Sequence, residues 1–196
     1  SCAAARDKGR NKIHFQSFNE EVTKRRRLAT SMPKIVSALD ENRFTLFAQP
    51  IVSLNPNVAL PKYYEILVRM RDNDGTILPP SEFIPVAEHY SLIDDLDKWV
   101  FTNALAFLKK LHQKSAILPT LAVNLSGSTV GDENAIDYIL AGFSDSGIAP
   151  KHIQFEITET AAGKHLSEAK QLIGTLRPVG VPFALDDFGS GLPRFA

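Results

Sequence analysis

The sequence predicts an α/β fold in which a parallel β-sheet is covered by helices. From residue 120 onward, short apolar runs typical of strands alternate with longer runs in which apolar residues recur at helical spacing. This alternation is typical of right-handed βαβ units, whose connecting helices cover the sheet. The length of 196 residues, 44% of them hydrophobic, is enough to bury the core of one domain.

Each expected element follows from its local pattern. The apolar runs predict strands over residues 44–53, 63–70, 120–126, 152–158 and 182–187. Apolar residues that recur every three or four positions predict helices over residues 93–111, 136–143 and 166–176. A further helix is expected to start near residue 31 with Ser31 as its N-cap, and turns are expected at DNDG 72–75 and SDSG 144–147.

Charge and cysteine content limit the function classes. Lys plus Arg equals Asp plus Glu at 22 each, so no net charge draws the chain to a nucleic acid polymer or an anionic membrane. The basic run 24–27 is expected to be a solvated helix face. A single cysteine, Cys2, favours a reduced cytosol. No apolar run approaches the roughly 20 residues of a membrane span, so we expect a cytoplasmic segment without direct membrane contact, and an upstream anchor stays open.

Oxygen-bearing side chains stand near the ends of four predicted strands. They are Glu65, then Asn124, then Glu156 and Glu159, and finally Asp186 and Asp187. Carboxylate and carboxamide oxygens are the ligands that Mg²⁺, Mn²⁺ and Ca²⁺ prefer, and parallel strands could bring these groups to one edge of the sheet. Neighbouring carboxylates repel unless cations neutralise them. We therefore expect a hard-cation site, with the chain bending after Asp186 at Gly189 and Gly191.

A second feature of the same region is a basic side chain on the strand that carries Glu65. Residues two apart in a strand share a face, so Glu65, Leu67 and Arg69 should line one cavity. Arg69 could bind an anionic ligand there. A structural ion pair between Glu65 and Arg69 is an equally good interpretation of that pair alone.

Six segments together resemble a known family in order and spacing. They are FAQPIVSL, EILVRM, PPSEFIPVAEH, VNLS, FEITET and ALDDFGSG, and they resemble the EAL domain of cyclic di-GMP phosphodiesterases over about residues 43–192. Residues 1–16 similarly resemble the last helix and strand of a GGDEF (diguanylate cyclase) domain. The expected organisation is a GGDEF-like tail at 1–16, a linker helix region at 17–42 and an EAL-like phosphodiesterase domain at 43–196.

The resemblance implies a TIM-like (β/α) barrel whose first strand runs against the others, with two Mg²⁺ or Mn²⁺ ions at its C-terminal rim. The metal ligands would be Glu65, Asn124, Glu156, Asp186 and Asp187. Glu159 would position the loop after the last strand, and Gln49, Leu67 and Arg69 would hold cyclic di-GMP. The implied reaction is hydrolysis of cyclic di-GMP to linear pGpG, in which two ions activate water and clamp the phosphodiester.

Two departures from the family pattern modify this expectation. Ile66 replaces the signature alanine, on the strand face opposite Glu65, and Leu192 stands where the family usually has tyrosine. In addition, residues 44–196 are fewer than the roughly 250 of a complete eight-stranded barrel. We expect about five of eight strands, and this polypeptide alone is expected to be inactive and to form a homo-oligomer through uncovered apolar surface.

Two other functions stay open at this point. A non-catalytic cyclic di-GMP receptor could share the same motifs, although a pure receptor need not keep the acidic ligands. An unrelated metal-dependent barrel, such as a lyase, would require the ordered series of motifs to be coincidence. A screen for hydrolysis of cyclic di-GMP separates all three.

Overall fold

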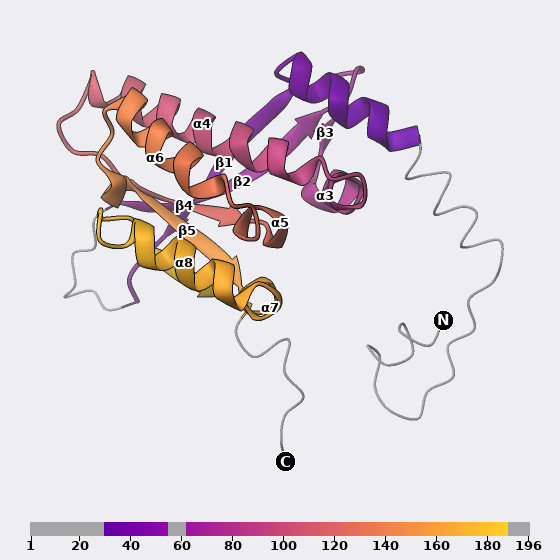
Figure 1. Ribbon diagram of the computed structural model, residues 1–196. Coiled ribbons are helices and arrows are strands. Elements are labelled where there is room, and N and C mark those ends of the chain that lie inside the picture. The colour runs from indigo at the N-terminus through magenta and orange to yellow at the C-terminus, as the bar shows by residue number, and fades with distance from the viewer. Residues whose placement is uncertain (1–29, 55–61, 188–196) are drawn as a thin grey trace.

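The computed structural model describes residues 30–54 and 62–187. The expectations for the GGDEF-like tail, the basic run 24–27, Gly189, Gly191 and Leu192 lie outside these residues. The elements, in chain order after a helix over residues 30–40, are β1 (Phe44–Ile51), β2 (Tyr63–Arg71), β3 (Ile77–Leu78), α3 (Pro80–His89), α4 (Ile93–His112), β4 (Thr120–Leu125), α5 (Gly127–Val130), α6 (Ala135–Ser146), the 3-10 turn η1 (Pro150–His152), β5 (Ile153–Thr158), α7 (Glu159–Lys164), α8 (Leu166–Leu176) and β6 (Phe183–Asp186) (Figure 1).

One sheet organises these elements. Its strand order is β1-β2-β4-β5-β6, with β3 paired to the far end of β2. Strands β2, β4, β5 and β6 are parallel, and β1 runs antiparallel to β2. The predicted alternation of strands and helices is confirmed, and so is the reversed first strand that the family resemblance implied. The carboxyl ends of β4 and β5 lead directly into α5 and α7 (Figure 1).

The hydrophobic core lies between the sheet and the helices on one of its faces. In β5, Ile153, Phe155 and Ile157 are at most 1% exposed, whereas the residues between them point to the open face. Phe101 of α4 lies near the centre of this core, with its ring 5.3 Å from that of Phe143 and 5.6 Å from that of Phe155. Because apolar side chains fill one face, the polar residues of the strands gather on the other.

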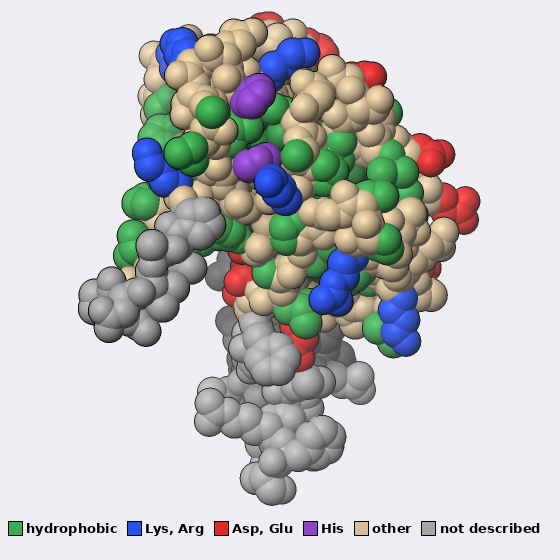
Figure 2. All heavy atoms as spheres, turned by 90° about the vertical axis from the view of Figure 1, so that its left-hand side faces the viewer, with side chains coloured by type: hydrophobic (Ala, Val, Ile, Leu, Met, Phe, Trp, Pro, Cys, Tyr) green, Lys and Arg blue, Asp and Glu red, His purple; other side chains and the backbone are tan. Residues whose placement is uncertain are grey.

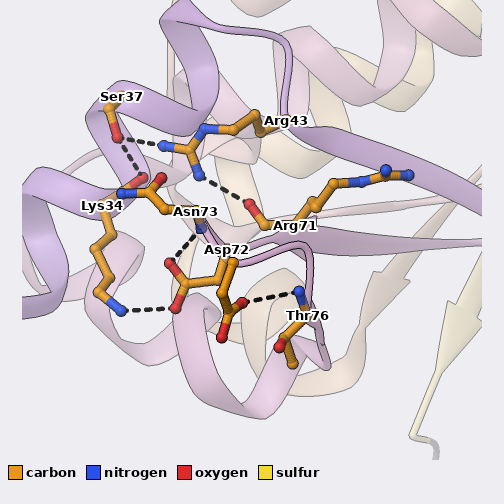
Figure 3. A network of polar contacts seen from close by, with 8 residues as sticks. Lys34, Ser37, Arg43, Arg71, Asp72, Asn73 and Thr76 are labelled. Atoms are coloured by element: carbon orange, nitrogen blue, oxygen red, sulfur yellow. Dashed lines mark hydrogen bonds and ion pairs between the residues drawn. The ribbon is translucent and has the colours of Figure 1, made fainter.

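The helix over residues 30–40 is joined to the same core. Ile35 and Ala38 are fully buried. Its polar side meets the turn after β2, where Lys34 Nζ lies 2.7 Å from Asp72 Oδ2 (Figure 3). Arg43 donates to the Arg71 carbonyl at 2.8 Å and also to the Ser37 hydroxyl. These contacts fix the helix to the β2–β3 hairpin.

The expected N-cap of that helix is wrong. Thr30 and Ser31 are both already helical, and an N-cap residue has non-helical backbone angles. The turn at 72–75 is confirmed, with Gly75 at φ +87 and its N–H donating to the Asp72 carbonyl. In SDSG 144–147 the helix continues to Ser146, and the turn consists of Gly147, whose left-handed φ of 69 ends α6.

Three short helices and one short strand have no counterpart in the predicted elements. Helix α3 begins with a proline and contains another, Pro85, which obscures its helical pattern in the sequence. Helices α5 and α7 have four and six residues, too few for a periodic signal. They depend on their caps instead, because Ser126 accepts from the Thr129 N–H and Thr158 from the Ala161 N–H.

The two ends of the sheet differ in charge. Figure 2 shows the end opposite α5 and α7, where Lys, Arg and His side chains face the viewer and acidic side chains lie mostly at the margin. The connections that enter β4 and β5 there, residues 113–119 and 147–152, contain no Asp or Glu. Among the described helices, none has both the length and the apolar character needed to cross a membrane.

Candidate functional site

Four of the predicted ligands lie on the open face of the sheet. Glu65 is paired in register with Ala122, and Asn124 follows two residues later on the same face of β4. Asn124 is in turn paired with Glu156 of β5. Glu156 is paired with Ala184, two residues before Asp186. The strand registers thus place oxygen donors from β2, β4, β5 and β6 near one edge of one face.

A hydrogen bond joins the first two of these donors. Asn124 Nδ2 donates to Glu65 Oε1 at 3.2 Å. This bond holds the amide nitrogen toward β2 and leaves the carboxamide oxygen of Asn124 for another partner. The same two side chains can therefore present oxygen to a cation without a change of strand register.

The carboxylates of this face influence one another. Partial burial raises the pKa of Glu156, and the negative charges of Glu65 and Asp186 raise that pKa further. The pKa of Tyr63 on β2 is also raised, first by burial and then by the charge of Glu156. The region is therefore one of concentrated negative charge, which a divalent cation would relieve.

The chain turns sharply after β6. Asp186 is the last residue of the strand, and Asp187 has φ 55, in the left-handed region that few non-glycine residues adopt. The bend expected after Asp186 therefore begins at Asp187 itself. Glu159 is the first residue of α7 and follows Thr158, which is paired in register with Asp186. Asp187 and Glu159 thus both lie at the carboxyl edge of the sheet.

The predicted substrate residues lie on β1 and β2. Gln49 is paired with Glu65, and Leu67 with Phe47. The Arg69 guanidinium lies 5.5 Å from the centre of the Phe47 ring and donates to the Val68 carbonyl. No ion pair joins Arg69 to Glu65 in the part of the chain that the structure describes, so the alternative of a structural ion pair is wrong.

The donor set fits a hard cation, although the acidic side chains do not form a closed cluster. In residues 30–54 and 62–187, no three His, Cys, Asp or Glu side chains approach closely enough to hold a metal ion. The donors on the shared face are nevertheless carboxylate and carboxamide oxygens, the ligand type of Mg²⁺ and Mn²⁺. The structure shows their common face, and their convergence on one ion stays a prediction.

One polar group next to this edge was missed by sequence reasoning. Asp97 and Asp94, in the first turns of α4, accept hydrogen bonds from the β4–α5 turn, including the Ser126 N–H and the Thr129 hydroxyl. Asp97 shares a helix face with Ile93 and Phe101, which are both buried. A carboxylate within this apolar stripe is the feature of the sequence that could have identified Asp97. The turn also borders a pocket of about 360 Å³ between α5 and α7.

Comparison with known proteins identifies the family. The family model described as EAL domain matches residues 33–196. The chain therefore belongs to the EAL domain family. It is 34% identical over 199 residues to the cyclic di-GMP phosphodiesterase PdeB of Shewanella oneidensis, in an alignment that covers 100% of this chain and 23% of PdeB. It is 32% identical over 161 residues to the cyclic di-GMP phosphodiesterase RocR of Pseudomonas aeruginosa, covering 82% of this chain and 40% of RocR.

Solved structures give the same fold. The FimX EAL domain from Pseudomonas aeruginosa bound to c-di-GMP matches with a TM-score of 0.75 and 28% identity, over 82% of this chain and 63% of that chain. The c-di-GMP complex of the PaMucR phosphodiesterase matches with a TM-score of 0.73 and 27% identity, over 85% of this chain and 65% of that chain. The predicted fold class, an incomplete TIM-like barrel of the EAL type, is confirmed.

Proposed function

We propose that the protein to which this chain belongs hydrolyses cyclic di-GMP to linear pGpG. The observation that carries the proposal is the common face of Glu65, Asn124, Glu156 and Asp186, set by the strand registers. Support also comes from relatives that are named cyclic di-GMP phosphodiesterases. The chain spans less than half the length of these relatives, so the proposal concerns the activity of the intact EAL domain.

The residues of the chain divide into two proposed roles. Glu65, Asn124, Glu156, Asp186 and Asp187 would hold two Mg²⁺ or Mn²⁺ ions, with Glu159 positioning the loop that begins at Asp187. The ions would supply a Lewis acid that activates water and neutralises the charge of the phosphodiester. Carboxylates from different strands suit this role because they are fixed by the sheet and need little reorganisation.

The substrate would lie over β1 and β2, beside the metal ligands. Arg69 would contact a phosphate, since its guanidinium is partly exposed on the open face and makes no ion pair with Glu65. Leu67 lies two residues from Arg69 on the same face of β2, and Gln49 is paired with Glu65. Both would contact the rest of cyclic di-GMP. A charge-assisted contact to phosphate would orient the scissile bond toward the acidic edge.

The test is hydrolysis of cyclic di-GMP by the intact EAL domain in Mn²⁺ or Mg²⁺, with pGpG resolved by chromatography. We expect pGpG release that chelation by EDTA abolishes. Glu65→Gln should lose most of this activity, because it removes the charge of a metal ligand while keeping its size. Binding of cyclic di-GMP without turnover would instead identify a receptor, and neither binding nor turnover would refute the proposal.

Location, the activity of the chain alone and its oligomeric state are also proposed. We propose a cytoplasmic location and, for residues 1–16, the end of a GGDEF domain, on the grounds of the composition and motifs given above. We propose that the 196-residue chain alone is inactive, since it covers 63% of the FimX EAL domain chain and 65% of the PaMucR chain. We also propose a homo-oligomer, since Phe47 on β1 is 48% exposed and Leu185 on β6 is 56% exposed.

A further inference from the structure

A partly buried polar network, with Thr129 buried at its centre, joins the start of α4 to the turn after β4. Asp97 Oδ2 accepts from the Ser126 N–H at 2.9 Å and from the Thr129 hydroxyl at 2.8 Å. Asp94 lies one turn earlier on α4, and it accepts from the Ser128 hydroxyl at 3.0 Å and from Thr129 at 3.2 Å. Two carboxylates of one helix thus bind three polar residues of the turn and of α5, namely Ser126, Ser128 and Thr129.

Removing the polar groups of this network from water costs free energy. Thr129 is 4% exposed, and the single hydrogen of its hydroxyl is shared between Asp97 at 2.8 Å and the more distant Asp94 at 3.2 Å. Burial raises the pKa of Asp97 to about 6, despite the hydrogen bonds that favour its charged form. Removing a carboxylate from water costs free energy, and an apolar residue would pack at this position at lower cost. Packing alone therefore explains Asp97 poorly.

The position of the turn supplies the explanation. Ser126 follows Leu125, the last residue of β4, and lies two residues after Asn124. Ser126 also caps α5 by accepting from the Thr129 N–H at 3.1 Å. A carboxylate that binds the Ser126 N–H therefore fixes the direction in which the chain leaves the strand immediately beyond Asn124.

The position of α5 is coupled to that of α7, the short helix after β5. Helix α5 lies against α7, which follows β5 and Glu156. A Cβ added at Gly127 would come within 3.3 Å of Ala161 Cβ, so the two short helices are already in close contact. A shift of α5 would consequently be transmitted to the edge that carries Asn124 and Glu156.

We propose that Asp97 is a positioning residue that holds the β4–α5 turn so that Asn124 presents its carboxamide oxygen at the acidic edge. This inference rests on the proposed function for its catalytic consequence. Its structural part, the anchoring of the turn, is independent of that function. The hydrogen bonds that Asp97 makes within residues 30–54 and 62–187 go to Ser126 and Thr129, so Asp97 would act through the backbone of Ser126.

The experiment compares Asp97→Ala and Asp97→Asn in the full-length protein. Asparagine keeps an oxygen that can accept from the Ser126 N–H and the Thr129 hydroxyl, whereas alanine removes it. We expect Asp97→Ala to raise amide hydrogen exchange in residues 121–131 at least tenfold and to raise the Mn²⁺ concentration for half-maximal turnover about tenfold, the range seen when groups that orient metal ligands are removed. Asp97→Asn should stay within about threefold of wild type in both measurements.

Two variants control for a purely structural effect. Asp95→Asn changes an exposed carboxylate on the same turn of α4 and should leave exchange and Mn²⁺ requirement at wild-type values. Ile139→Val trims a core residue of α6 that is 1% exposed, and it should raise exchange throughout the domain without a selective change at 121–131. An Asp97→Ala protein that behaves like Ile139→Val, or like wild type, overturns the proposal.

The two proposals can fail separately. If the wild-type protein does not hydrolyse cyclic di-GMP, the proposed function is wrong, and the exchange measurement alone then decides whether Asp97 anchors the turn. If Asp97→Ala does not fold, Thr129→Val replaces it, because this change removes one of the two donors to Asp97. A selective rise in exchange at 121–131 in Thr129→Val supports the anchoring role, and unchanged exchange there overturns it.

Discussion

At the residue scale, the face of the strand on which a side chain lies decides its role. Glu65 points to the open face and meets Asn124, whereas the adjacent Ile66 is 6% exposed in the core. The larger side chain at the position of the signature alanine therefore extends the core and lies away from the ligands, as its strand position predicted. The same alternation places Leu67 and Arg69 on the face of Glu65.

Arg69→Ala should weaken binding of cyclic di-GMP about tenfold or more, because it removes a charge-assisted contact to phosphate. Mn²⁺ binding should change much less, since no metal ligand is lost. Calorimetry with each ligand in turn checks both statements. Arg69→Lys is the matched control: it keeps the charge but loses the planar group that lies over Phe47. Unchanged nucleotide affinity in Arg69→Ala would exclude the phosphate contact.

Asp97 should make stability depend on pH. Burial raises its pKa from 3.8 to about 6, and repulsion by Asp94 adds to this. The folded protein therefore binds the proton more tightly than the unfolded chain does. The stabilisation is fully present below about pH 4 and is lost as pH rises through about 6. The groups that face Asp97 from α5 and its N-cap are the neutral Thr129 and Ser126. Tyr138 of α6 faces it as well, since burial and then the charge of Asp97 raise the pKa of Tyr138.

The measurement is urea unfolding between pH 4 and 7, followed by the fluorescence of the single tryptophan. We expect the free energy of unfolding of wild type, relative to that of Asp97→Asn, to fall by on the order of 2 kcal/mol across this range. Asp95→Asn should keep the wild-type pH dependence. Parallel pH profiles for wild type and Asp97→Asn would show that the carboxylate is not held at a raised pKa.

At the element scale, long periodic segments could be predicted and short capped ones could not. The spacing of apolar residues located α4, α6 and α8, because each has a buried stripe several turns long. The ends of β1, β2 and β5 were found to within two residues. Helices α5 and α7 depend on one side-chain cap each, and α3 contains Pro85, so none of them has a clear pattern. Asn124, Glu156 and Asp186 lie within the last three residues of their strands, whereas Glu65 is the third residue of β2. Asp97 required knowledge of which turn packs on α4.

Gly142 allows α6 to approach α4. A Cβ at this position would lie 2.6 Å from Phe101 Cε1, in the centre of the core. Gly142→Ala should therefore destabilise the protein by about 1 to 2 kcal/mol, because overpacking outweighs the better helix propensity of alanine. Gly174 in α8 has no neighbouring atom within 4 Å of the same position, so Gly174→Ala should stabilise by about 0.5 to 1 kcal/mol. Equal effects of the two substitutions in urea unfolding would contradict this account of the packing.

At the scale of the whole molecule, charge is separated along the strands. The connections that enter β4 and β5 lack carboxylates, and the opposite edge carries Glu65, Glu156 and Asp186. The zero formal charge therefore conceals an acidic edge that would repel an anionic substrate without bound cations. This arrangement connects the fold to the proposed chemistry, since the edge becomes suitable for a phosphodiester once its charge is neutralised.

The most direct test of the central claim is the turnover of cyclic di-GMP by Asp186→Asn in the intact EAL domain with Mn²⁺. The substitution keeps the size of the side chain at the end of β6 and removes one negative charge from the acidic edge. We predict that pGpG release falls at least a hundredfold, while circular dichroism and thermal unfolding stay close to wild type. Wild-type turnover in a folded Asp186→Asn protein would contradict the assignment of this edge as the metal-binding and catalytic site.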